Sequence, residues 1–149
     1  MKLPELLAPA GNLEKLKTAL LFGADAVYVG GKNFSLRAQS DNFDFAALQE
    51  GVQYAHELGK KVYVALNVFA HQKELQGIAA YLPELLDAKI DAVIVADPGV
   101  FRLVRQEAPN LPVHISTQAN TVNASAACFW HELGAKRVVL AREVTYKEL

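Results

Sequence analysis

Four short apolar segments of the sequence each end in a side chain that can make strong hydrogen bonds. These four residues are Asn67, Asp97, Gln118 and Arg142. A carboxylate or an amide held near the reacting atoms can orient a substrate or move a proton, and an arginine fork binds carboxylates and phosphates. We therefore predict catalytic roles for the first three residues and a substrate-binding role for the arginine.

Two side chains outside those positions add to the candidates. Arg37 lies on the long stretch after the second apolar segment, where its guanidinium could hold a carboxylate or phosphate of a substrate. His71 follows the third segment and could act as an acid or base near neutral pH. A solvated surface position is the alternative for each. The phosphate-binding patterns GxxxxGK[ST] and GxGxxG are both absent from the sequence.

Several familiar catalytic patterns are also absent. The sequence has no HExxH helix, no GxSxG turn and no Cys–His pair at a readable spacing. Ser116 and His114 lie two residues apart on one predicted strand, without the supporting group that a nucleophile and its base require. Cys128 lies among apolar residues and is predicted to be a core side chain. The sequence therefore shows no protease machinery and no metal site.

Alternating strands and helices must position the candidate residues. The predicted strands are Pro4–Ala8, Ala26–Gly30, Val62–Asn67, Ala92–Asp97, Val113–Gln118 and Arg137–Arg142, and the predicted helices are Leu13–Phe22, Phe45–Leu58, Glu74–Ala88, Pro98–Glu107 and Ala124–Leu133. Short apolar strands separated by helices form parallel βαβ units. The predicted fold class is α/β, a parallel (β/α) barrel of TIM type, in an incomplete portion with about six strands and five helices. Ligands of such folds bind at the carboxyl ends of the strands.

The end of the sequence carries the start signal of a further helix. Thr145 and Glu148 have the spacing of a capping box, and one residue follows them. Because a TIM-type barrel has eight strands, we expect residues 1–149 to be a single N-terminal barrel portion of a longer chain; a complete six-stranded sheet is the alternative. The first and sixth strands would then leave open sheet edges, which predicts self-association.

Strand alternation assigns the polar side chains to the two faces of the sheet. In the fifth strand Val113, Ile115 and Thr117 share the apolar face that should meet the helices. The inward set is then His114, Ser116 and Gln118 of this strand, together with Glu5, Tyr28, Tyr63, Asn67, Asp97 and Arg142. Unpaired buried polar groups cost about 1 to 3 kcal/mol each, so the inward groups must pair with one another, with water or with a ligand. At the amino ends we expect an internal network, of Glu5 with His114 or Tyr63, and at the carboxyl rim a ligand site.

Composition and charge narrow the class of protein. The 149 residues are 52% hydrophobic and 21% charged, as in an ordinary globular protein. No apolar run approaches the roughly 18 residues that a membrane span needs, and the first residues lack a signal peptide's apolar stretch, so we expect a cytoplasmic protein with no membrane partner. The net charge of −1 leaves no basic footprint for nucleic acid. The lone cysteine excludes an internal disulfide and a cysteine-only metal site within this chain.

Seven stretches of the sequence, taken together and in order, resemble the collagenase-like peptidase family of unassigned catalytic type. They are Pro4–Asn12, Gly23–Gly30, Ser35 and Arg37 with Asn42 and Phe43, Gly59–Asn67, Asp91–Gly99, Ser116–Asn120 and Arg137–Glu143. The resemblance runs through the whole chain. It implies an N-terminal β/α barrel followed, in the full-length parent, by a region whose cysteines hold an iron–sulfur cluster. Because this chain has only Cys128, we expect no cofactor within it and no activity from it alone.

The resemblance also implies a substrate. Members of the family make 5-hydroxyuridine at the tRNA wobble position with prephenate as hydroxyl donor, hydroxylate a ribosomal RNA cytidine, or support ubiquinone hydroxylation, and the family carries a collagenase label. We expect the tRNA activity, with tRNA and prephenate as partners of the parent; proteolysis through Ser116 and the other two hydroxylations are the alternatives. On this reading Arg37, Arg142, Tyr28, Asn120 and Ser116 bind substrate, while Asp97, Gln118 and Asn67 act at the reacting group.

Overall fold

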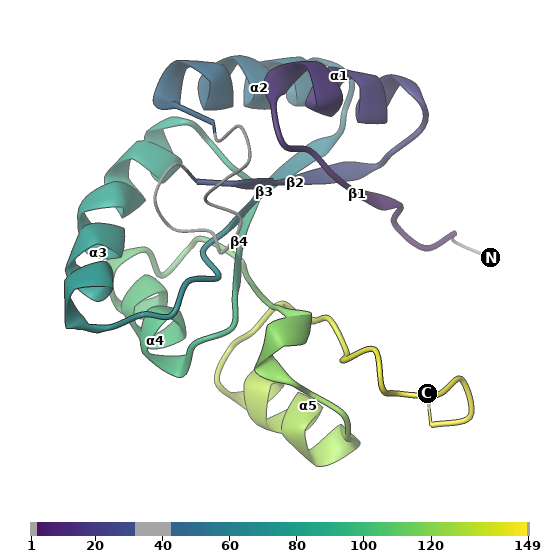
Figure 1. Cartoon of the computed structure of the whole chain (residues 1–149), viewed down its shortest axis with the longest axis vertical. Helices are drawn as coiled ribbons and strands as arrows, with labels where there is room; N and C mark the ends of the chain where they lie inside the picture. The colour runs from purple at the N-terminus through teal and green to yellow at the C-terminus, as the bar shows by residue number, and fades with distance from the viewer. Residues whose placement is uncertain (1–2, 32–42, 149) are drawn as a thin grey trace.

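A computed structural model describes residues 3–31 and 43–148. Within these residues six parallel strands form one sheet in sequence order: β1 (Leu7–Pro9), β2 (Ala26–Gly30), β3 (Lys61–Ala65), β4 (Ala92–Val95), β5 (Val113–Ile115) and β6 (Arg137–Val138). The sheet curves into a half-barrel that is open on one side, with the helices on its outer, convex face (Figure 1). The predicted α/β half-barrel is therefore confirmed. β1 and β6 are its outermost strands, and self-association through them stays a prediction.

In the described part of the chain, five helices follow the first five strands and cover the sheet: α1 (Leu13–Leu21), α2 (Phe45–Glu57), α3 (Gln72–Asp87), α4 (Pro98–Glu107) and α5 (Ala124–Glu132). Each predicted helix is present. Four of them begin at a side chain that accepts a hydrogen bond from the backbone three residues later, at 2.9 Å in each case. These N-caps are Asn12, Asp44, Asp97 and Asn123. Such a cap satisfies a backbone N–H that the helix itself leaves without a partner.

The strands separate two clusters of buried side chains. Valines and isoleucines on the outer face, such as Val27, Val64 and Ile115, pack against the helices in the main core. The inner face carries a smaller cluster that includes Ala26, Tyr63 and Ile94, with Tyr28 packed against it. Alternation along the strands explains this division, and it confirms the predicted faces of Val113, Ile115 and Tyr28.

All of the described strands except β2 are shorter than the sequence pattern predicts. β5 ends at Ile115 because Ser116 caps a short 3-10 helix, η1 (Thr117–Ala119), whose backbone the Ser116 hydroxyl binds. β6 ends at Val138, and Arg142 lies in an exposed turn beyond it. β1 is Leu7–Pro9, so Glu5 precedes it. The predictions that Gln118 and Arg142 end strands are therefore wrong, and both residues are exposed. Their inward direction stays a prediction, since alternation applies only while the chain remains extended.

The structure also tests two predictions for the last 25 residues of the chain, one for Cys128 and one for the Thr145–Glu148 pair. Cys128 is exposed on α5, so its predicted place in the core is wrong. Only Trp130 of that helix is buried. The capping interaction of Thr145 and Glu148 is present, since the Glu148 carboxylate accepts from the Thr145 N–H at 2.8 Å and from its hydroxyl at 2.6 Å. Residues 146–148 form a turn there.

Candidate functional site

One hydrogen bond spans three strands at the carboxyl rim of the sheet. The Asn67 side-chain N–H donates to the Ser116 hydroxyl oxygen at 3.0 Å, and the Gln118 backbone N–H donates to the same oxygen at 3.2 Å. Continuing the register of β3, β4 and β5 places Asn67, Ala96 and Ser116 at one level of the inner face. The small Ala96 side chain leaves room for the amide and the hydroxyl to meet across β4. We call Asn67 and Ser116 the rim pair.

Unpartnered polar atoms gather in the segments that follow β3 and β5. Within residues 3–31 and 43–148, the buried side-chain oxygens without a hydrogen-bond partner are Asn67 Oδ1, Glu74 Oε2 and Thr121 Oγ1. Asn67 directly follows β3, Glu74 lies in the first turn of α3, and Thr121 lies between η1 and α5. An unsatisfied buried acceptor costs about 1 to 3 kcal/mol, so these atoms mark the carboxyl rim as the place where a ligand could supply the missing donors.

Asp97 begins α4, as the Asp97–Pro98 pair predicts. β4 ends at Val95, two residues before Asp97, so strand alternation does not fix the direction of this side chain. Its carboxylate accepts from the Val100 N–H at 2.9 Å and begins α4. The sequence carried both signals, a strand end and an Asp–Pro helix start, and the helix start decides the direction of the side chain.

Replacing Asp97 with alanine should lower the free energy of unfolding by about 1 kcal/mol, because the Val100 N–H loses its acceptor. Urea denaturation followed by circular dichroism measures the change. Asp97→Asn is the matched control, since an asparagine also caps helices, and it should stay within about 0.5 kcal/mol of the original protein. A cost for the asparagine variant as large as for the alanine variant would show that Asp97 acts through its charge.

The remaining candidates are dispersed over the rim. Gln118 and Asn120 are exposed on and after η1, with Asn120 in the left-handed region at φ 54°. His71 is exposed and precedes α3 without capping it. Tyr28 is half-buried on the inner face. Arg37 lies outside the described residues. The structure thus brings together Asn67 and Ser116, whose contact the sequence did not predict.

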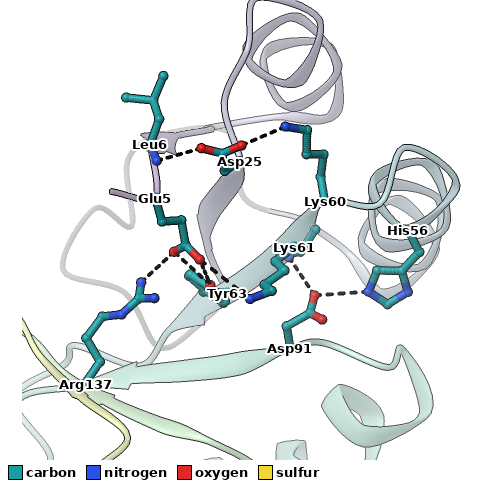
Figure 2. Close-up of polar contacts among 10 residues, drawn as sticks. Glu5, Leu6, Asp25, His56, Lys60, Lys61, Tyr63, Asp91 and Arg137 are labelled. Carbon is teal, nitrogen blue, oxygen red and sulfur yellow. Dashed lines mark hydrogen bonds and ion pairs between the residues drawn. The ribbon is translucent and has the colours of Figure 1, made fainter. Parts of the chain in front are cut away.

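A second polar cluster lies at the opposite, amino end of the barrel interior (Figure 2). The Glu5 carboxylate accepts from the Arg137 guanidinium at 2.6 Å and from the Tyr63 hydroxyl at 3.0 Å. The Lys61 ammonium is 3.7 Å from the same carboxylate, and His114 meets the Tyr63 ring edge to face with centroids 4.7 Å apart. We call these five residues the Glu5 cluster. The predicted hydrogen bond between Glu5 and Tyr63 is confirmed. The contact of Arg137 with Glu5 was not predicted from the sequence.

The charges of the Glu5 cluster follow from its burial. The Arg137 guanidinium holds the pKa of Glu5 below its usual range. Burial raises the pKa of the Tyr63 phenol to about 12. Burial, helped by the Arg137 charge, lowers the pKa of His114 to about 4. At neutral pH the cluster therefore holds a carboxylate paired with a guanidinium beside a neutral imidazole. Groups that satisfy one another at the amino end of a barrel serve stability.

Two aspartates connect neighbouring segments through hydrogen bonds and ion pairs at the amino ends of the strands (Figure 2). Asp25 accepts from the Lys60 ammonium at 2.8 Å and from the Leu6 N–H at 3.0 Å. Asp91 accepts from the Val62 N–H at 2.8 Å and lies 3.0 Å from the His56 ring. In the part of the chain that the structure describes, no three His, Cys, Asp or Glu side chains are grouped to hold a metal ion. None of the helices described there is long and apolar enough to cross a membrane.

The sequence profile of peptidase family U32 matches residues 11–149. The chain belongs to this family. It is 50% identical over 148 residues to tRNA hydroxylation protein P1 of Bacillus subtilis, a match that covers 99% of this chain and 35% of that protein. It is 42% identical to the uncharacterized protease MJ0090 of Methanocaldococcus jannaschii, over 100% of this chain and 36% of that protein. The chain thus spans about a third of the length of these relatives.

A solved structure of the U32 peptidase Mk0906 has the same fold as this member of family U32. The TM-score is 0.70 at 19% identity, with 94% of this chain and 59% of that chain covered. The half-barrel is therefore an arrangement that the family and other TIM-barrel proteins share. At this level of identity the likeness concerns the fold alone.

Proposed function

We propose that this chain forms the N-terminal barrel portion of a protein that hydroxylates tRNA, making 5-hydroxyuridine at the wobble position with prephenate as hydroxyl donor. The observation that carries the proposal is the 50% identity to a tRNA hydroxylation protein through 99% of the chain. With tRNA as the substrate, we also propose a cytoplasmic location for the protein.

The rim pair gives the proposed reaction a site. Ser116 fixes the Asn67 amide through one hydrogen bond and leaves the amide oxygen without a donor. A fixed polar group at the carboxyl ends of barrel strands is suited to orient a substrate. Arg37 or Arg142 would hold the carboxylates of the hydroxyl donor, and Gln118, Asn120 and Tyr28 would contact the bound substrates. Asp97 contributes by starting α4 at the rim.

An iron–sulfur cluster does not fit the residues of this chain. Clusters are held by several cysteine thiolates, and the sequence has Cys128 alone, exposed on α5. In our proposal the cluster of the full-length parent is held by residues outside this chain, and no step at the rim depends on it.

Nucleoside mass spectrometry of tRNA tests the proposal. In a strain that lacks the gene encoding this chain, 5-hydroxyuridine and the nucleosides made from it should disappear. Unchanged amounts would overturn the proposal. When the deletion strain is complemented, Asn67→Ala should lower the modified fraction about tenfold, the effect of losing roughly one oriented hydrogen bond. Asn110→Ala is the control, because Asn110 is exposed in the α4–β5 connection at the other end of the sheet.

Proteolysis is the second candidate, favoured by the 42% identity to an uncharacterized protease. The geometry gives it little support. The Ser116 hydroxyl accepts two hydrogen bonds, neither of them from an imidazole, while His114 packs on Tyr63 and burial lowers its pKa to about 4. Gelatin cleavage by the purified protein that disappears in Ser116→Ala would establish proteolysis; cleavage that persists in this variant belongs to another residue or to a contaminant.

A further inference from the structure

We propose that the segment after β3 reads a pyrimidine base that has left its stack. Phe69 supplies the ring on which the base lies, and Asn67 Oδ1 accepts a hydrogen bond from an N–H on the base edge. The choice of a pyrimidine rests on the proposed function; the two contacts rest on the geometry of residues 66–71.

Packing contacts separate Asn67 and Phe69 from the apolar residues of this segment. Leu66 is buried in the helix-side core, and Val68 and Ala70 pack against that core. Phe69 lies between them and is exposed, so its ring points to solvent and away from this core. The Asn67 amide reaches Ser116 across the inner face.

Phe69 is an unusual residue for such a position. Its side chain is 77% exposed, although burying a phenylalanine is worth about 1.5 to 3 kcal/mol. An exposed aromatic ring on the rim of a site matches the way in which proteins hold unstacked bases, which lie on aromatic faces and are read at their edges. Such stacking also suits a protein with a net charge of −1, because it needs no phosphate contacts.

The rim pair determines which base edge can bind. One N–H of the Asn67 amide donates to Ser116 and fixes the orientation of the amide. The oxygen, buried and without a donor, is the free half of the amide. An acceptor in this position selects a base with an N–H on its Watson–Crick edge. Uracil presents one such group, at N3.

Titration of the 149-residue chain with uridine, followed by NMR of its backbone and side-chain amides, tests the inference. Uridine should shift the side-chain amide signals of Asn67 and the backbone signals of residues 66–71. N3-methyluridine lacks the N–H and should bind roughly five- to tenfold more weakly. Equal binding of the two nucleosides would overturn the role of Asn67 Oδ1.

The aromatic contact is tested by Phe69→Ala, with Phe22→Ala as the matched control. Phe22 is 86% exposed and ends α1 at the opposite end of the barrel. Phe69→Ala should weaken uridine binding roughly tenfold, within the range measured for base–aromatic stacking, and Phe69→Trp should preserve it. Because both phenylalanines are exposed, neither alanine variant should alter folding. Equal affinities of Phe69→Ala and Phe22→Ala would overturn the stacking role.

Failure of this inference and failure of the proposed function give different results. If the deletion strain loses 5-hydroxyuridine but Phe69→Ala restores it as fully as the original gene does, the function stands and the base-reading segment is wrong. If the deletion leaves 5-hydroxyuridine unchanged while the chain binds uridine through Asn67 and Phe69, the base-reading segment stands and the substrate of the protein is another pyrimidine.

Discussion

Glu5→Ala is expected to lower the free energy of unfolding by about 2 to 3 kcal/mol. The substitution removes the acceptor of the Tyr63 hydroxyl, on a residue that is only 2% exposed, and the counterion of the Arg137 guanidinium. Arg137 also lies over the Tyr63 ring at 5.6 Å, so it loses the contact that fixes it there. Urea denaturation of the variant at neutral pH measures the cost.

Two further variants separate the contributions to that cost. Lys61→Ala removes a cation 3.7 Å from Glu5 whose side chain is 55% exposed, and should cost less than about 0.5 kcal/mol. Glu5→Gln keeps an acceptor for the Tyr63 hydroxyl and removes the charge, so its cost should fall between the other two. If Glu5→Ala costs no more than Lys61→Ala, the Glu5 cluster does not stabilise the barrel.

The Glu5 cluster also shows how far strand alternation extends. The pattern correctly put Glu5, Tyr63 and His114 on the inner face, because period-two alternation holds along any extended segment. Arg137 obeys the same rule and was not predicted, although it begins the strand whose predicted end is Arg142. A charged residue at the start of a buried strand, opposite an inward glutamate, was the available signal.

The rim shows where alternation stops. Asp97 and Gln118 were assigned by counting along strands that end at Val95 and Ile115. Beyond those points local hydrogen bonds decide the directions of the side chains, with Asp97 capping α4 and Ser116 capping η1. Short polar side chains at strand ends form hydrogen bonds with nearby backbone N–H groups. The alternation of apolar and polar residues therefore predicts which residues lie at the rim, but it does not predict the directions of their side chains.

Cys128 illustrates a related limit on a helix. Its apolar neighbours favoured the core, but only Trp130 of α5 is buried, where it packs against Phe101 of α4. Phe129 is more than half exposed. The apolar residues of α5 are spread around the helix, so composition alone did not identify the buried side.

Acid should destabilise the protein in a window set by His114. Burial lowers the pKa of this imidazole from 6.5 to about 4 in the folded protein. Between these two values the unfolded chain binds a proton that the folded chain does not bind, so the free energy of unfolding falls as the pH falls from 6.5 to about 4. The expected loss across this window is about 3 kcal/mol. Below pH 4 the contribution of His114 becomes constant.

His114→Phe isolates this contribution. Phenylalanine keeps the edge-to-face contact with Tyr63 and cannot bind a proton, so most of the slope between pH 6.5 and 4 should disappear. His131→Phe, at an exposed position on α5, should keep the slope. Glu5 has a lowered pKa, and its stabilisation is lost only as the pH falls below about 4.5. Loss in that lower range should therefore remain in the His114 variant. A slope that His114→Phe leaves unchanged would mean that the imidazole is protonated inside the barrel, next to Arg137.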